Sequence, residues 1–274
     1  MCGDCGCVIT SVPHEHGPHT HTHGHGHDHD HDHHHGHEHD HAHGADGAVI
    51  PVTVLENILA DNDARAAHNR ARFGAAGVLA LNLMSSPGSG KTRWLEATAD
   101  ALGAARMAVI EGDLETENDA ERLRAKGVAA HQITTGMACH LDAAMVARGA
   151  DALDLATPRY LFIENVGNLV CPASFDLGQH ANVVLLSVTE GDDKPLKYPV
   201  IFRAADLVLI TKADLAPLLD DFDIARATAA VHRVQPAARV IVCSAKSGEG
   251  LRDWLAWLAA AADDKNQEAP HAHD

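Results

Sequence analysis

The stretch from Ser85 to Thr92, SSPGSGKT, constrains the fold of this chain more than any other feature. It follows an apolar run over residues 78–84, typical of a buried strand, and precedes residues 92–102, which have the pattern of a helix. A glycine-rich turn in this setting binds phosphate groups. Ser85 stands where the common motif GxxxxGK[ST] has glycine, so the first turn must be made differently. The stretch still predicts a phosphate-binding loop.

The later residues of this loop each have an expected role. Gly88 and Gly90, on either side of Ser89, let the backbone turn its amides toward a phosphate. Lys91 can reach the outer phosphates, and Thr92 can place its hydroxyl on Mg²⁺. An ordinary glycine-rich connection is the alternative. The helix dipole at Lys91 and Thr92 favours an anion, so we expect a nucleoside triphosphate there.

Strand and helix patterns alternate along the rest of the chain. The strands are rich in Val, Ile and Leu, as in a parallel sheet buried on both faces. A leading helix over 51–73 is expected to pack on this domain. We predict an α/β P-loop NTPase fold with a mostly parallel seven-stranded sheet flanked by helices. The predicted strands are 78–84, 106–110, 128–133, 159–164, 182–188, 206–211 and 239–243, and the predicted helices are 92–102, 116–126, 140–149, 222–234 and 250–262.

Two acidic residues follow predicted strands at the sheet edge where ligands bind. Asp113, in the stretch EGD, can hold Mg²⁺ through water or position the attacking water. Glu164, in the stretch ENVG, can lie beside the metal, and the amide of Gly167 can meet the terminal phosphate. Either acid alone can be an ordinary loop residue. Together they predict catalytic roles for Lys91, Asp113 and Glu164.

The sixth predicted strand ends in TKAD, residues 211–214, which is close to the Asn-Lys-x-Asp element that reads guanine in GTPases. The Asp214 carboxylate can accept hydrogen bonds from N1 and N2 of guanine, which adenine cannot supply. Lys212 can lie along the base. An element resembling the one that meets the guanine oxygen is formed by Ser244, Ala245 and Lys246. The sequence therefore predicts GTP in preference to ATP.

The N-terminal segment carries metal-binding side chains. Cys2, Cys5 and Cys7 are close enough to wrap one soft or borderline metal ion. Sixteen histidines follow within residues 14–43, interleaved with Gly, Asp and Glu. Such a segment has too few apolar side chains to offset the entropy of ordering, so we predict disorder and metal storage. The expected division is an extension over 1–47, a GTPase domain over 48–264 and a flexible tail over 265–274.

A second set of possible metal ligands lies inside the domain. Cys139 and His140 are expected at the start of the helix after the third strand. Adjacent helical residues point about 100° apart, so these two can share an ion only in a loop or at a helix end. If Cys171 approaches them, two thiolates and an imidazole can bind Zn²⁺ or Ni²⁺. A lone buried cysteine is the alternative.

Cys171 also lies on the segment that would move when Gly167 gains or loses a γ-phosphate. Nucleotide hydrolysis can therefore alter the geometry of such a metal site.

Charge and cysteine usage limit the partners. The chain has 21 Lys and Arg against 38 Asp and Glu, a formal charge of -17, which argues against nucleic acid. No apolar run reaches the ~18 residues of a membrane helix. Closely spaced cysteines favour metal ligation over disulfides in a reducing compartment. We expect a cytoplasmic protein with no nucleic-acid or membrane partner.

Together these motifs resemble the HypB family, the nickel-incorporation GTPases of [NiFe]-hydrogenase maturation, within a class of dimerising P-loop GTPases. The resemblance implies slow GTP hydrolysis and a homodimer that depends on nucleotide or metal, with the inner metal site at its interface. It also implies delivery of Ni²⁺ to the hydrogenase large subunit with a HypA-type chaperone. The expected ligands are GTP, Mg²⁺, Ni²⁺ and Zn²⁺. The motifs behind it are CGDCGC, the histidine tract, Ser85–Thr92, EGD, Cys139-His140, Glu164–Pro172 and Thr211–Asp214.

Three other functions remain open. A urease-type GTPase of the UreG family typically has Cys-Pro-His where this chain has Cys171-Pro172-Ala173, and it lacks the N-terminal cysteines, so the sequence favours the hydrogenase branch. A zinc-handling GTPase is the second alternative. A nickel reservoir in which the nucleotide domain is secondary is the third.

Overall fold

The computed structural model describes residues 52–113, 118–136 and 138–268. The predicted metal ligands Cys2, Cys5 and Cys7 and the histidine tract lie outside the described residues. The boundary expected at residue 48 does so as well, and these expectations stay predictions.

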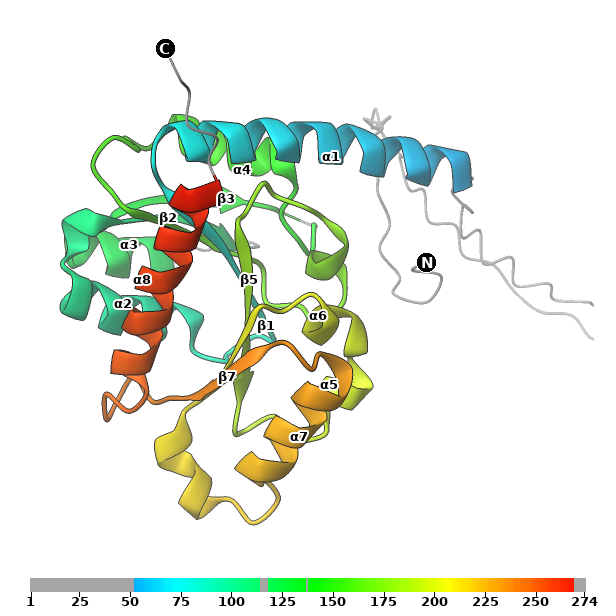
Figure 1. Ribbon diagram of the computed structural model, residues 1–274, viewed down its shortest axis with the longest axis vertical. Helices are drawn as coiled ribbons and strands as arrows, with labels where there is room; N and C mark the ends of the chain where they lie inside the picture. The colour runs from blue at the N-terminus through cyan, green and yellow to red at the C-terminus, as the bar shows by residue number, and fades with distance from the viewer. Residues whose placement is uncertain (1–51, 114–117, 137, 269–274) are drawn as a thin grey trace, which may run out of the picture.

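A single sheet of seven parallel strands forms the centre of the molecule (Figure 1). The strand order is β3-β2-β4-β1-β5-β6-β7, so β1 lies in the middle and is buried along its whole length. The predicted α/β P-loop fold is confirmed. The strands are β1 (Leu79–Ser85), β2 (Met107–Asp113), β3 (Ala129–Thr134), β4 (Tyr160–Glu164), β5 (Ala181–Ser187), β6 (Leu207–Thr211) and β7 (Arg239–Val242).

Helices cover both faces of the sheet (Figure 1). On one face, Trp94 of α2 and Trp254 of α8 pack with Leu81 and neighbouring strand residues. On the other face, α1 and α4 cover one half of the sheet, and α6 and α7 cover the other half. The helices are α1 (Val52–Ala75), α2 (Lys91–Leu102), α3 (Asn118–Ala125), α4 (Ala143–Asp151), α5 (Lys194–Lys197), α6 (Pro199–Arg203), α7 (Ile224–Val234) and α8 (Leu251–Glu268).

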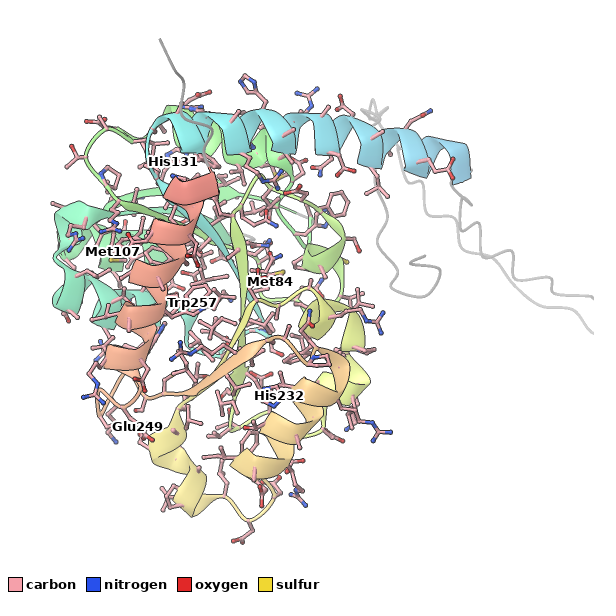
Figure 2. The ribbon with its side chains drawn as sticks, viewed as in Figure 1. Met84, Met107, His131, His232, Glu249 and Trp257 are labelled. Carbon is pink, nitrogen blue, oxygen red and sulfur yellow. The ribbon has the colours of Figure 1, made fainter. Side chains whose placement is uncertain are left out.

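Alternation along the strands explains these two layers, since successive side chains point to opposite faces. Leu83 of β1 joins the cluster under α2 and α8, whereas the next residue, Met84, joins the cluster under α6 and α7. Met84 and Met107, labelled in Figure 2, are both buried. Among the described helices, none is long and apolar enough to cross a membrane.

Most helix boundaries lie within two residues of those predicted, and two differ by more. Helix α4 begins at Ala143 rather than near residue 140, because the Asp142 carboxylate accepts a hydrogen bond from the backbone N–H of Met145 at 2.7 Å and caps the helix there. Cys139 and His140 therefore lie in the preceding loop and do not begin the helix. Helix α8 continues to Glu268, past the helix end predicted at residue 262. The short helices α5 and α6 were not among the predicted elements.

Helix α1 is attached to the domain through two buried asparagines. The amide oxygen of Asn62 accepts from the backbone N–H of Ala143 at 2.9 Å, and its nitrogen donates to the carbonyl of Asp176 at 2.8 Å. Asn69 donates to the carbonyls of Ala143 and Leu177. These bonds hold the start of α4 against the loop that precedes β5. The expectation that this helix packs on the nucleotide domain is confirmed.

Candidate functional site

The phosphate loop joins β1 to α2 at the carboxyl edge of the sheet. Gly88 has φ of 72° and Gly90 has φ of 97°, backbone conformations that only glycine adopts without strain. Lys91 is the first residue of α2, and its Nζ donates to Oγ of Ser85 at 2.9 Å. Ser85, which replaces the usual glycine, is fully buried and also donates to the carbonyl of Ser86. Its side chain therefore serves as a support for the lysine.

The element after β6, two strands from β1 in the sheet, braces this loop. Oγ1 of Thr211 donates to the carbonyl of Ser89 at 2.7 Å, and Nζ of Lys212 donates to the carbonyl of Gly88 at 2.7 Å. Thr211 stands where guanine-binding elements have asparagine, and here it makes a loop contact. Lys212 has φ of 58°, a left-handed conformation that is costly for a residue with a side chain.

A pocket of about 260 Å³ opens beside these residues. Oγ of Ser244 donates to Oδ1 of Asp214 at 2.5 Å, and Nζ of Lys246 lies 3.8 Å from Oδ2 of the same carboxylate. A carboxylate fixed in this way can accept from a base that presents two N–H groups. The predicted base-binding residues are thus brought together. The lining consists of Ser89, Gly90, Arg93, Trp94, Thr211, Lys212, Asp214, Leu215, Ser244, Ala245 and Lys246.

A buried acidic cluster lies next to the phosphate loop. Carboxylate oxygens of Glu111, Asp119 and Glu164 lie within 4.8 Å of one another. Oγ1 of Thr92 is 2.9 Å from Oδ2 of Asp119 and 2.9 Å from Oε1 of Glu164. The register of the sheet creates this arrangement, because β2 and β4 pair with Glu111 directly opposite Glu164.

The electrostatics of this cluster suit a divalent cation. Burial, and then the neighbouring Glu164, raise the pKa of Glu111 to about 8. Burial raises the pKa of Glu164 to about 7, although Lys91 opposes the shift. One carboxylate oxygen of each of these glutamates accepts no hydrogen bond from the described part of the chain. Oxygen ligands in close array with unused lone pairs fit Mg²⁺.

The acids differ from those chosen from sequence. Glu164 lies in the cluster as expected, but the member of the EGD stretch that belongs to it is Glu111, not Asp113. The backbone carbonyl of Asp113 accepts from the N–H of Thr135 at 2.8 Å. Asp119 was not predicted, because it lies in α3 beyond the strand end. One sequence signal could have identified Glu111: an acidic residue within a buried strand needs a hydrogen-bonding or metal partner.

The loop after β4 touches the phosphate loop. A Cβ on Gly167 would lie 2.8 Å from Cα of Pro87, so only glycine allows the two backbones to approach this closely. The loop after β4 therefore lies against the phosphate loop at Gly167, and a contact of the Gly167 amide with the terminal phosphate stays a prediction.

Cys139, His140 and Cys171 meet on the other side of that loop. Their ligand atoms lie within 4.8 Å of one another, with Sγ of Cys139 3.7 Å from Nδ1 of His140. The His140 ring stacks on Phe175 with centroids 4.0 Å apart. Burial lowers the pKa of His140, which favours the neutral imidazole that binds metals. We call these three residues the metal cage. Two thiolates and an imidazole are a donor set for Zn²⁺ or Ni²⁺.

The remaining cysteine and histidines that the structure describes lie outside both clusters. Cys243 is fully buried, and burial raises its pKa to about 12, as expected for a core residue. His180 accepts from the backbone N–H of Ala80 at 3.0 Å, and burial lowers its pKa to about 4. His131 and His232, labelled in Figure 2, lie on β3 and α7 and belong to neither cluster.

The parallel sheet, the phosphate loop after its central strand and the acidic cluster beside it define a P-loop nucleotide-binding protein, the class of which nucleotide hydrolysis is typical. Residues 79–242 match the family model described as "CobW/HypB/UreG, nucleotide-binding domain". The chain belongs to this family, in its HypB branch of hydrogenase maturation factors.

Individual relatives support this assignment. The hydrogenase maturation factor HypB of Azotobacter chroococcum mcd 1 is 56% identical over 208 residues, covering 76% of this chain and 68% of that protein. The crystal structure of Helicobacter pylori HypB in complex with nickel has a TM-score of 0.71 and 45% identity, over 78% of this chain and 99% of that one. The HypB structure from Archaeoglobus fulgidus has a TM-score of 0.70 and 39% identity, over 74% of this chain and 100% of that one. The resemblance seen in the sequence is confirmed.

Proposed function

We propose that this protein hydrolyses GTP and uses the nucleotide cycle to deliver Ni²⁺ into the large subunit of a [NiFe]-hydrogenase. One observation carries the proposal. The segment from Glu164 to Cys171 begins in the acidic cluster, touches the phosphate loop at Gly167 and ends in the metal cage. A single short segment therefore joins the site of hydrolysis to the site of the metal.

The preference for GTP rests on Asp214. Ser244 donates to one of its oxygens, while the other lies beside Lys246 at the edge of the pocket. A base that donates from both N1 and N2 suits this carboxylate, and adenine has no such pair of donors.

The phosphate residues have separate roles. The phosphates would be bound by Lys91 together with Gly88, Ser89 and Gly90. Thr92 and Glu164 would hold Mg²⁺. When bound, the ion would neutralise charge on the phosphates. Asp113 stays a proposed water-positioning residue, and the geometry adds Glu111 and Asp119 as candidates for the same metal.

Nickel is the cargo, and several further parts of the proposal rest on family membership. They are a homodimer dependent on nucleotide or metal, a HypA-type nickel chaperone as partner, and activity in the cytoplasm. Cys2, Cys5 and Cys7 would bind a second metal ion, and the tract over 14–43 would store nickel. The solved HypB structure from Helicobacter pylori holds nickel, which supports nickel as the ion.

The test combines turnover with metal release. The full-length protein loaded with Ni²⁺ and Mg²⁺ should hydrolyse GTP in preference to ATP, and turnover should accelerate transfer of Ni²⁺ to a chelator. An Asp214→Asn variant should weaken GTP binding about 100-fold and improve binding of XTP, whose C2 oxygen can accept from the new amide. Equal turnover of GTP and ATP by the unchanged protein would contradict the assignment.

The donor set of the metal cage also favours a zinc-handling role, because two thiolates and one imidazole suit Zn²⁺ equally well. Cells that lack the gene separate the two functions. Rescue of hydrogenase activity by added nickel supports nickel delivery, whereas unchanged hydrogenase activity together with a growth defect that only added zinc relieves supports the alternative.

A further inference from the structure

Two asparagines in the loop after β4 bind the segment that carries the metal cage. Asn165 is only 1% exposed, and its amide oxygen accepts from the backbone N–H groups of Leu141 at 3.1 Å and Val166 at 3.0 Å. Its amide nitrogen donates to Oδ1 of Asn82 at 3.2 Å, in the strand that leads into the phosphate loop. Asn165 therefore joins three segments: β1, its own loop and the segment after His140.

Asn168 makes a similar connection on the other side of His140. Its amide nitrogen donates to the carbonyl of Cys139 at 3.4 Å, while its oxygen accepts from the backbone N–H of Val170 at 2.8 Å. The backbone on both sides of His140 is thus bound by asparagines of one loop. The contact at Val170 also fixes the residue next to Cys171.

Gly167 lies between these two asparagines and against Pro87 of the phosphate loop. A phosphate that drew the Gly167 amide toward it would shift the loop, and the asparagines would pull on either side of His140. A buried amide that loses such a bond is left without a partner, which is costly. Movement at Gly167 is therefore passed on to the metal cage and not absorbed locally.

We propose that Asn165 and Asn168 are positioning residues that couple the state of the nucleotide to the geometry of the metal cage. Neither is a metal ligand or a nucleotide ligand in this arrangement. The inference rests on the proposed function, because it requires that nucleotide and metal binding depend on one another. It adds the residues through which they do so.

The matched control is Asn62 of α1. Its amide also binds backbone next to the metal cage, at Ala143 and Asp176, but neither of these two hydrogen bonds involves residues 164–171, the segment that touches the phosphate loop. Loss of its bonds should loosen the metal cage by the same amount in every nucleotide state. An asparagine that only supports the fold would behave in this way.

The experiment measures Ni²⁺ affinity of the full-length protein by competition with a chelator, with Mg²⁺ and either a non-hydrolysable GTP analogue or GDP. The signal is the Ni²⁺–thiolate absorption that a Cys171→Ser variant loses, which excludes nickel bound elsewhere in the chain. The ratio of the two affinities should be about 5–150-fold, the usual range of coupling between sites. Nucleotide affinity is measured in parallel and should change little in the asparagine variants.

Asn168→Ala and Asn165→Ala should each bring this ratio close to one, whereas Asn62→Ala should weaken nickel equally in both states and keep the ratio. Asn168 is half-buried, so its loss should disturb the fold less than the loss of the buried Asn165. If Asn165→Ala does not fold, Asn168→Ala alone tests the inference. If Asn168→Ala keeps the affinity ratio of the unchanged protein, with or without an equal loss of nickel affinity in both states, the inference is overturned. The proposed function is not affected by that result. A ratio of one in the unchanged protein overturns the coupling in the proposed function as well.

Discussion

The phosphate loop and the metal cage are both in contact with the segment from Glu164 to Cys171, yet they are built differently. Gly88 to Thr92 are consecutive in the chain, and their positions are set by the backbone of one turn and the start of α2. The metal cage takes its ligands from two separate segments, the loop at 139–140 and the start of a 3₁₀ helix over Cys171–Ser174, and none of the three ligands lies in an α-helix or strand. The phosphate loop is defined locally, whereas the metal cage is defined only by tertiary contacts.

The difference explains how a protein can hold one ligand in a fixed position and still release another. The phosphate loop is braced by Thr211 and Lys212, which donate hydrogen bonds to its carbonyls from the end of β6. The metal cage is held by single hydrogen bonds from asparagines and by the stacking of His140 on Phe175. Segments held by a few side-chain contacts open at lower free energy than strands in the core.

The largest expected effect is at the nucleotide site. Lys91→Ala should lower kcat for GTP hydrolysis by roughly 10²–10³-fold or more, because it removes the positive charge that meets the transferred phosphate. Steady-state phosphate release measures it. Lys126→Ala, which breaks a surface pair with Asp100, is the control and should leave turnover unchanged. Hydrolysis at the unchanged rate by Lys91→Ala would contradict the assignment of this loop as the site that binds the phosphates.

A somewhat smaller effect is expected at the metal cage. Cys171→Ser should weaken Ni²⁺ binding there by roughly 10–100-fold, because a hydroxyl is a poorer ligand than a thiolate for this ion. Titration of the Ni²⁺–thiolate absorption measures it.

GTP affinity in the absence of nickel should not change in that variant, since the local site does not depend on the distant ligand. Cys243→Ala is the control, because this cysteine lies in the core, and it should keep the absorption. Retention of full nickel binding by Cys171→Ser would show that the three residues are brought together for another reason.

The smallest effect concerns the pH dependence of stability. The ordinary pKa of Glu111 is 4.5 and burial raises it to about 8, so between these values the folded protein holds a proton that the unfolded chain has lost. The free energy of unfolding should therefore fall as pH rises through this window, by at most about 1.4 kcal/mol per pH unit.

Urea unfolding from pH 5 to 8 without Mg²⁺ measures this slope. Glu111→Gln should make it less steep without removing it, since the amide does not titrate whereas Glu164, whose pKa burial raises to about 7, still does. Added Mg²⁺ should restore most stability at the upper end, where the carboxylate is ionised. A Glu111→Gln variant with the same slope as the unchanged protein would show that other groups carry the dependence.

Much of the nucleotide site was predictable because its signals are local. The glycines and Lys91 lie where a strand-to-helix turn requires them, and TKAD follows a strand. The acidic cluster was only partly predictable. Glu111 and Asp113 are two residues apart and share a strand face, so sequence alone does not say which one meets Glu164. Asp119 had no signal of its own.

By itself, the sequence determined the alternation of strands and helices, the position of the phosphate loop and the identity of the side chains that can bind metal, because each depends on neighbours within a turn or a strand. Tertiary structure alone decided that Glu111 lies opposite Glu164 and that Cys171 meets Cys139 and His140. Strand register and loop packing join residues that are far apart in the chain. Such contacts are fixed by the burial of whole elements, and no short pattern of residues encodes them.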